Sequence, residues 1–152
     1  MIIHISIPAD NPAHVAEVLA ELVQGTCKPL NWCPGGYMVF TDDNYSTGIE
    51  ILPNNIVFMP GATANQTLRI IRSEQQTTQY SGIHFLLTIN SSYEKIFAIA
   101  KRVGWQAVRK RSLGVVEMVE FWIENKTMVE IVLATEERKT IKALSSEAYQ
   151  GC

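Results

Sequence analysis

The sequence predicts an α+β fold in which two βαβββ modules form a curved mixed sheet around a cleft. Three observations lead to this prediction. Strand-like and helix-like patterns recur in the same order in the two halves of the chain. The first segment of each half alternates apolar and polar residues, which is the period of a half-buried strand. His4 and Glu50 recur 80 residues later as His84 and Glu130, with 46 residues from histidine to glutamate in each half.

The first half opens with a strand and a helix. Residues 2–7 read as the strand, because isoleucines alternate there with polar side chains. Asp10 or Asn11 can cap the helix that follows, and Pro12 suits its first position. Apolar residues then recur at helical spacing until Gly25, where we expect the helix to end.

Strands are expected to complete this half. Residues 26–36 contain two prolines and two glycines and read as a loop. Residues 37–40 and 47–52 read as strands on either side of a turn at 42–44. The short apolar run at 56–59 is the third strand-like segment after the helix.

The second half repeats this order. Residues 83–89 alternate as a strand, and Ser91 and Glu94 then stand at capping-box spacing before a helix that stops at Gly104. The turn between the last two strands falls at residues 124–127. Three strands are expected after the helix, at residues 105–109, 115–123 and 128–133.

These elements divide one compact domain of 152 residues into four segments. Residues 1–60 form the first module and residues 82–134 form the second. Residues 61–81 are rich in Thr, Gln, Ser and Asn and are expected to connect the modules over the surface. Residues 135–152 are expected to form a charged, helical C-terminal tail.

Composition narrows the class of protein. A net charge of −2 and the absence of any Lys/Arg-rich face speak against a nucleic-acid partner. Neither a signal peptide nor a membrane span is apparent, so we expect no membrane partner. Three cysteines without CxxC spacing, Cys27, Cys33 and Cys152, indicate reduced thiols in the cytoplasm. A small-molecule substrate is the expected partner.

The repeated histidines and glutamates are candidate metal ligands. Each stands on the strand face opposite a fully apolar row, and that face can line a cavity. Two imidazoles and two carboxylates suit Zn, Ni, Co, Mn or Fe(II). The alternative is structural: a lone histidine on a strand is usually hydrogen-bonded, and a strand glutamate usually faces water. The candidate metal ligands are His4, Glu50, His84 and Glu130.

The sequence leaves the chemistry of such a site open. Four protein ligands in an octahedral shell leave two positions for a bidentate substrate, whose carbonyl or enediolate the ion can stabilise. Glu50 or Glu130 can then act as the catalytic base that moves a proton between adjacent carbons. A shell with two histidines and one carboxylate would instead permit oxygen chemistry.

The chain resembles the vicinal oxygen chelate superfamily, which includes glyoxalase I, fosfomycin-resistance proteins, bleomycin-resistance proteins and extradiol dioxygenases. The resemblance covers both modules and is strongest at four places: His4 in the first strand, Glu50 in the final strand of its module, Gly82-Ile83-His84 and Val129-Glu130-Ile131. It implies that these histidines and glutamates chelate a metal in a glyoxalase-like lyase or isomerase. It also implies that two chains pair as a homodimer, and it matches Asn54 to a glutathione-contacting asparagine.

Two departures from the family weaken the link to glutathione. Pro8 stands where glyoxalase I carries an arginine, and the Phe-Tyr pair usual in the first helix is absent. Two alternatives therefore stay open. One is a non-catalytic, ligand-sequestering module like the bleomycin-resistance proteins. The other is an Fe(II) dioxygenase that uses His4, His84 and Glu130.

Other conspicuous residues have simpler interpretations. His14 is expected to be a solvated helix residue, and Cys33 has no base near it in sequence that would make it a reactive thiol. Glu117 and Glu120 lie near the proposed cavity but are expected to face water. The tryptophans are expected to be core or interface anchors: Trp32, Trp105 and Trp122.

Overall fold

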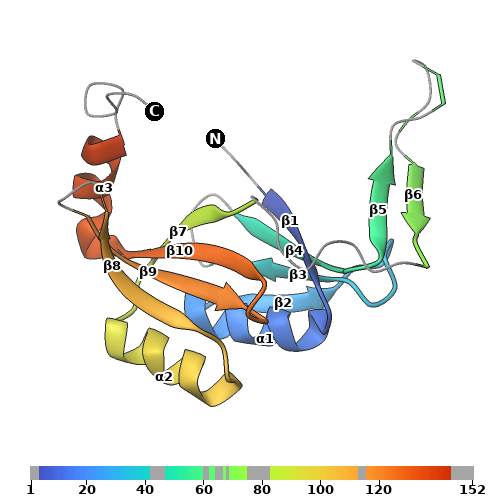
Figure 1. The fold of residues 1–152 in the computed structure, drawn as a ribbon. Coiled ribbons are helices and arrows are strands. Elements are labelled where there is room, and N and C mark those ends of the chain that lie inside the picture. The colour runs from blue at the N-terminus through green and yellow to red at the C-terminus, as the bar shows by residue number, and fades with distance from the viewer. Residues whose placement is uncertain are drawn as a thin grey trace. The chain divides into compact units, whose positions relative to one another are not determined.

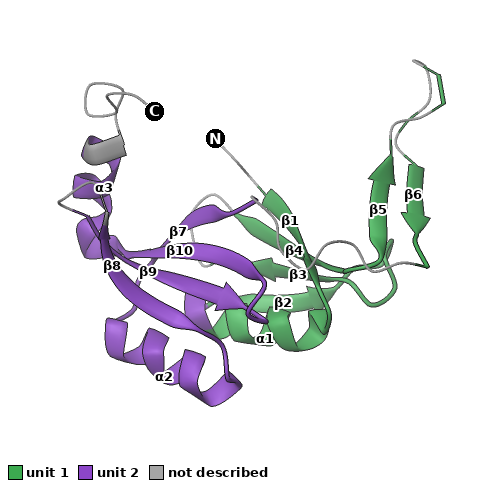
Figure 2. Cartoon of the chain, in the orientation of Figure 1, with its two compact units in different colours: residues 1–21, 25–79 green, residues 22–24, 80–152 purple. Residues whose placement is uncertain are grey.

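The structure is a computed structural model that describes residues 4–41, 47–59, 62–63, 67, 69–74, 83–112 and 116–144 (Figure 1). The chain divides into two compact units, coloured separately in Figure 2. Unit 1 holds residues 1–21 and 25–79, and unit 2 holds residues 22–24 and 80–152. Each unit contains one four-stranded sheet, and unit 1 also contains a two-stranded one.

Unit 1 contains the first βαβββ module. Its strand order is β1-β4-β3-β2, with β1 parallel to β4 and the other neighbours antiparallel. β1 and β4 can run parallel because the long connection between them contains a helix, whereas antiparallel neighbours can be joined by short turns. The elements are β1 (His4–Ala9), α1 (Pro12–Val23), β2 (Thr26–Pro29), β3 (Tyr37–Phe40) and β4 (Gly48–Pro53).

Unit 2 repeats this topology with the strand order β7-β10-β9-β8, in which β7 is parallel to β10. The 3-10 helix η1 (Ala134–Glu136) and the helix α3 (Glu137–Leu144) follow the sheet, and α3 contacts β9 and β10. The predicted pair of βαβββ modules is thereby confirmed. The module consists of β7 (Phe85–Ile89), α2 (Tyr93–Val103), β8 (Ala107–Ser112), β9 (Val116–Ile123) and β10 (Thr127–Leu133).

The two parallel strand pairs have the same register. In unit 1, Ser6 pairs with Glu50, and in unit 2, Leu86 pairs with Glu130. Adding 80 to both residue numbers of the first pair gives the second pair. Every other pair between β7 and β10 corresponds in the same way to a pair between β1 and β4. The 80-residue repeat in the sequence is therefore also a repeat of strand alignment.

Alternation along the strands separates an apolar side from a polar side. In unit 1, the odd-numbered strand residues Ile7, Val39, Ile49 and Ile51 are buried, as are apolar residues of α1. Even-numbered residues of β1 and β4, among them Ser6 and Glu50, share the opposite side. The buried apolar residues are Ile7, Val15, Val18, Leu19, Val39, Ile49 and Ile51.

Unit 2 has apolar contacts on both sides of its sheet. On the α2 side, Trp105 packs edge-on against Phe121 with 5.8 Å between ring centroids, as expected of a core tryptophan. On the other side, Met118 and Val132 form a buried cluster with Val116, and Leu86 packs against it. The even-numbered face of unit 2 is therefore partly filled by apolar side chains.

Helix ends follow the sequence signals with one exception. Asn11 caps α1 as expected, since its Oδ1 accepts a hydrogen bond from the backbone N–H of His14. Gly104 ends α2 in the left-handed region, also as expected. The predicted cap Ser91 is wrong by one residue. Ser92 caps α2 instead, and its Oγ accepts from the N–H of Lys95.

Two segments of the first half differ from the sequence prediction. Residues 26–29, predicted as loop, form β2 and pair with β3 at the edge of the sheet, where Pro29 is tolerated. The run at 56–59 is β5 (Ile56–Met59), which leaves the sheet and pairs with β6 (Arg69–Arg72) from the predicted connector. The third strand of the module after the helix is therefore β4.

Several predictions fall outside the described residues: the start of the first strand at 2–3, the turn at 42–44, much of the 61–81 connector, and residues 145–152 of the tail. Within the described part of the chain, no helix has the length and apolar character needed to cross a bilayer.

Candidate metal centre

His4 and Glu50 occupy the same side of neighbouring strands in unit 1. His4 pairs with Gly48, and Glu50 lies two residues farther along β4, opposite Ser6. The two candidate ligands are therefore diagonal neighbours across the parallel strand pair. His4 is exposed, whereas Glu50 is only 9% exposed.

The carboxylate of Glu50 is held in place by Ser6. The Ser6 hydroxyl donates a 2.6 Å hydrogen bond to Glu50 Oε2. A carboxylate at this depth needs such a donor, because an unpaired buried charge is costly. This contact fixes the orientation of the carboxylate.

Gly48 leaves space beside His4. A Cβ at this position would lie 2.8 Å from Met38 Sδ and 3.6 Å from His4 Cβ. Met38 pairs with Glu50 from β3, so its side chain also lies on this side of the sheet. The absence of a side chain at Gly48 therefore accommodates Met38 next to the two candidate ligands.

His84 and Glu130 form the equivalent pair in unit 2. Glu130 pairs with Leu86 on β7, and His84 precedes Leu86 by two residues. His84 is exposed and lies just before the strand begins at Phe85. The predicted strand at 83–89 thus starts two residues later, while the matched spacing of histidine and glutamate is retained.

Lys110 is the charged partner of Glu130. Its Nζ lies 3.5 Å from Glu130 Oε1 and also donates a hydrogen bond to Glu120 Oε1. Glu120 and Glu130 oppose each other across β9 and β10. The hydrogen bond to Glu120 is the main reason why the pKa of Lys110 is raised, and Glu130 adds to it. One ammonium group therefore compensates two neighbouring carboxylates.

The two modules surround their glutamates differently. Ser6, which hydrogen-bonds Glu50, is replaced in the second module by the apolar Leu86. Met38, which pairs with Glu50, is replaced by the charged Glu120. Glu50 thus lies in a largely neutral setting, and Glu130 in an ionic one.

Each module contributes one histidine and one glutamate to its polar side. Within the residues that the structure describes, no three His, Cys, Asp or Glu side chains lie close enough together to hold a metal ion. The chemistry of the donor set, two imidazoles and two carboxylates, does fit a divalent ion. Two donors alone are fewer than the three protein ligands of a typical catalytic metal site, so neither pair by itself makes such a site.

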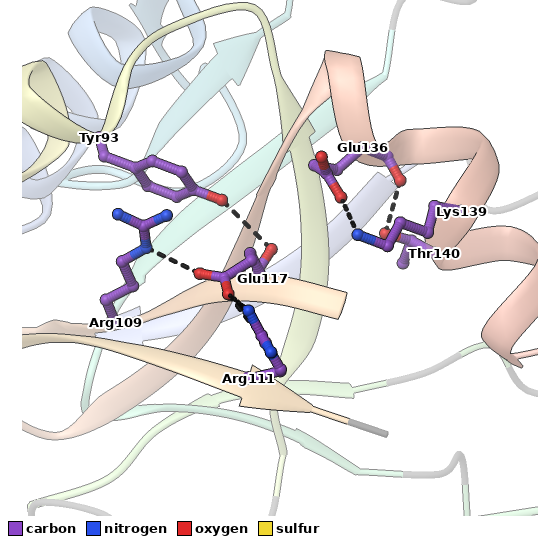
Figure 3. Close-up of polar contacts among 7 residues, drawn as sticks. All are labelled: Tyr93, Arg109, Arg111, Glu117, Glu136, Lys139 and Thr140. Carbon is purple, nitrogen blue, oxygen red and sulfur yellow. Dashed lines mark hydrogen bonds and ion pairs between the residues drawn. The ribbon is translucent and has the colours of Figure 1, made fainter. Parts of the chain in front are cut away.

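Glu117 does not share the side of Glu120. It accepts hydrogen bonds from Arg109 and Arg111, and Arg109 stacks on the ring of Tyr93 with 4.1 Å to the centroid (Figure 3). These two arginines lower the pKa of Glu117. Burial raises the pKa of Tyr93, whose hydroxyl donates to the backbone carbonyl of Glu117. This cluster ties β8 and β9 to the start of α2.

The remaining conspicuous residues lie apart from the ligand pairs or serve the fold. Asn54 donates a side-chain hydrogen bond to Asp10, and its backbone N–H bonds Ala9, so it joins the ends of β1 and β4. Cys33 is buried, and burial raises the pKa of its thiol. A raised pKa disfavours the thiolate, in agreement with the expectation that Cys33 is not a reactive thiol.

Sequence reasoning assigned no role to Ser6 or Lys110. The signal for Ser6 was its place in the alternation of the first strand, two residues after His4. Lys110 was missed because the strand was predicted to end at residue 109, whereas β8 runs on to Ser112. With the correct strand ends, Lys110 falls on the same side of the sheet as Glu120.

No family model matches the sequence, and no curated protein matches it. Solved structures do match the fold. The fosfomycin-resistance protein FosX from Listeria monocytogenes is 12% identical with a TM-score of 0.57, covering 90% of this chain and 94% of that one. A FosX structure from the same organism, in complex with Mn(II) and sulfate, is 14% identical with a TM-score of 0.55, over 93% and 95% of the chains.

A lactoylglutathione lyase from Agrobacterium tumefaciens is also similar, with 14% identity, a TM-score of 0.53, and coverage of 88% of this chain and 93% of that one. The protein therefore has the paired βαβββ fold of the vicinal oxygen chelate superfamily. At these identities the likeness concerns the fold, which agrees with the resemblance seen in the sequence.

Proposed function

We propose that this protein is a divalent-metal-dependent enzyme that acts on a small, oxygen-rich substrate through bidentate chelation. The proposed ligands are His4, Glu50, His84 and Glu130. The observation that supports the proposal is the shared register: each histidine precedes by two residues the strand partner of its glutamate. If the four residues bind one ion together, each module should contribute one imidazole and one carboxylate from equivalent strand positions. The residues of the two modules do occupy equivalent positions.

The chemistry follows from the donors. When bound, a divalent ion supplies a Lewis acid that polarises substrate oxygens. Glu50 and Glu130 are the groups that can take up and return a proton. Ser6 holds Oε2 of Glu50, which leaves Oε1 for the ion or for the proton. The proposed reaction class is that of a glyoxalase-like lyase or isomerase.

The similar structures support the choice of metal and class. One FosX structure is a complex with Mn(II), so Mn(II) is the first ion to test, beside Zn, Ni, Co and Fe(II). A lactoylglutathione lyase shares the fold. Pro8, in place of the arginine of glyoxalase I, favours a substrate other than a glutathione adduct. We further propose that the enzyme works as a cytoplasmic homodimer.

One observation favours a second candidate function, a small-molecule-binding module without a metal. Lys110 already compensates the charge of Glu130 and Glu120, so the second module needs no ion for that purpose. In such a protein the polar residues would bind the ligand directly through hydrogen bonds.

Metal analysis distinguishes the two functions. We expect purified protein supplemented with Mn(II) or Zn(II) to retain metal through gel filtration, and the His84→Ala and His4→Ala variants to lose it. His14→Ala is the matched control, because His14 lies on α1 outside the ligand set. Bound metal should also stabilise the fold, by about 2.7 kcal/mol at a hundredfold excess over Kd.

A wild-type protein that retains none of these ions, with a His84→Ala variant of unchanged stability and ligand binding, would overturn the metal proposal. A small molecule that binds this metal-free protein would then support the binding module.

A further inference from the structure

Met38 places a sulfur atom beside the candidate ligands of unit 1. It pairs with Glu50 across β3 and β4, so the two side chains stand on the same side of the sheet. Met38 Sδ lies against Gly48, at 2.8 Å from the position that a Cβ of this glycine would take. The Cβ of His4 lies 3.6 Å from the same position. The thioether is therefore a close neighbour of His4, on the face that also carries the carboxylate.

The three donors differ in their access to solvent. Glu50 is buried, Met38 is half-buried and His4 is exposed. Ser6 follows His4 by two residues on the same side of β1, and its hydroxyl holds Glu50 Oε2, so Oε1 is the oxygen that this bond leaves for an ion. An ion can therefore approach from the side of His4 and meet a nitrogen, a sulfur and an oxygen donor.

The second module has different side chains at the corresponding places. Glu120 holds the place of Met38, because it pairs with the second glutamate, and it accepts a hydrogen bond from Lys110. Met128 holds the place of Gly48, two residues before that glutamate. The combination of a thioether with a neighbour that lacks a side chain therefore belongs to unit 1.

The donor set of unit 1 matches a soft, singly charged ion. A thioether sulfur selects Cu(I), and an imidazole also suits copper. The thioether and a neutral imidazole bring no charge, so one Cu(I) ion and the Glu50 carboxylate are neutral together. A divalent ion held by the same three groups would leave a net positive charge beside a buried carboxylate, which is costly. The other charged residue paired on this side of β1 to β4 is Lys28, which lies opposite Met38 on the edge strand and is exposed.

We propose that unit 1 binds one Cu(I) ion by itself, through an imidazole nitrogen of His4, Sδ of Met38 and Oε1 of Glu50. This goes beyond the proposed function, which assigns His4 and Glu50 to a divalent ion shared with the second module. The two assignments differ at Met38 and His84. Cu(I) binding requires the thioether and not His84, whereas binding of the divalent ion requires His84 and not the thioether.

Nuclear magnetic resonance of the methionine methyl groups tests sulfur coordination directly. The chain has five methionines, and the Met38 signal is assigned by its absence from a Met38→Leu variant. Wild-type protein receives Cu(I) anaerobically with ascorbate, up to one equivalent more than its three thiols can take. We expect the Met38 methyl signal to shift. The Met118 signal, from the buried apolar cluster of unit 2, is the internal control and should not move. A Met38 signal that stays in place, or a shift of the Met128 signal instead, overturns the proposal.

Affinities of variants separate the Cu(I) site from the proposed divalent site. Competition with a chromophoric Cu(I) chelator is measured in a Cys27→Ser/Cys33→Ala/Cys152→Ser background, because thiolates also bind Cu(I). Met38→Leu should weaken Cu(I) binding by at least about tenfold, the loss that even an outer-shell partner of a metal causes, and should leave Mn(II) binding unchanged. His84→Ala should weaken Mn(II) binding and leave Cu(I) binding unchanged. Met118→Leu is the matched control and should affect neither ion.

The outcomes distinguish this inference from the proposed function. Loss of Cu(I) binding in His84→Ala to the same extent as in Met38→Leu overturns it, and so does equal loss in Met38→Leu and Met118→Leu. Circular dichroism checks that each variant is folded, and the methyl spectra of the wild-type chain do not depend on the cysteine substitutions. A chain that binds Cu(I) through Met38 but retains no divalent ion would support this inference while the proposed function fails.

Discussion

Ser6 and Glu50 face each other across the parallel strands β1 and β4, and the Ser6 hydroxyl donates a 2.6 Å hydrogen bond to the Glu50 carboxylate. The second module has no counterpart to this contact, because Leu86 opposes Glu130. Glu50 therefore depends on one neighbouring hydroxyl, whereas Glu130 has the ammonium of Lys110.

We expect Ser6→Ala to lower the free energy of unfolding by about 1.5–3 kcal/mol, the usual value of a hydrogen bond to a charged group. The physical reason is that the buried carboxylate loses its donor. Ser6→Thr keeps a hydroxyl and suits a strand, so it should retain most of the stability. Urea unfolding measures both, and a Ser6→Ala variant within about 0.5 kcal/mol of wild type would contradict the prediction.

Gly48→Ala should destabilise the first module by about 1–3 kcal/mol through overpacking. The added Cβ would lie 2.8 Å from Met38 Sδ, so the methionine side chain must move. Shortening that side chain should relieve the clash. In a double-mutant cycle with Met38→Ala, the double variant is expected to be more stable than the sum of the single effects. Strict additivity in urea unfolding would show that Met38 is not the residue in the way.

Glu117→Gln should reduce stability at neutral pH but not in acid. Hydrogen bonds from Arg111 and Arg109 lower the pKa of Glu117 in the folded state. A lowered carboxyl pKa contributes stability above the ordinary glutamate value of about 4.3 and loses it as pH falls through the folded-state pKa. The gap between wild type and variant, measured by urea unfolding, should therefore close on acidification.

The control for this pH dependence removes both donors. In an Arg109→Gln/Arg111→Gln background, adding Glu117→Gln should have no pH-dependent effect on the free energy of unfolding. A gap that stays constant from neutral to acid pH in the otherwise wild-type chain would refute the role of the arginines.

Lys110→Met should increase the affinity of the proposed site for Mn(II), by up to about fivefold on the scale of partly exposed ion pairs. The reason is that Lys110 competes with the ion for Glu130, whose Oε1 lies 3.5 Å from its Nζ. Arg109→Met is the matched control, since Arg109 neighbours Lys110 on β8 but binds Glu117 on the opposite side. Titration calorimetry compares the variants. Weaker binding by Lys110→Met would mean that the lysine holds the carboxylates in position.

The regular parts of the fold could be predicted because local signals agree there with the packing. Asn11 and Pro12 fix the start of α1, and Gly104 fixes the end of α2. The alternation around His4 predicted the first strand, and the 80-residue repeat predicted two similar modules. The register of the parallel strand pair in each module follows the same shift. These features depend on periodicity and caps, which are visible in a single sequence.

The remaining parts depend on partners that are distant in sequence. β2 carries Lys28 and Pro29 and shows no apolar alternation, so only its pairing with β3 reveals it as a strand. β6 pairs with β5 across a polar stretch that reads as linker. Lys110 joins the candidate site only through the alignment of β8 with β9. Charge pairing of this kind is not encoded in local spacing.

The placement of Glu50 between Ile49 and Ile51 has a consequence for how the first module folds. A shift of β4 by one residue against β1 would move the Glu50 carboxylate to the apolar side of the sheet and would move Ile49 and Ile51 to the polar side. An ionised group without a donor there would cost several kcal/mol. Glu50 thus raises the free energy of folding intermediates in which β4 is misaligned. Glu50→Leu should therefore produce a chain that tolerates a shifted strand register and aggregates more readily during refolding.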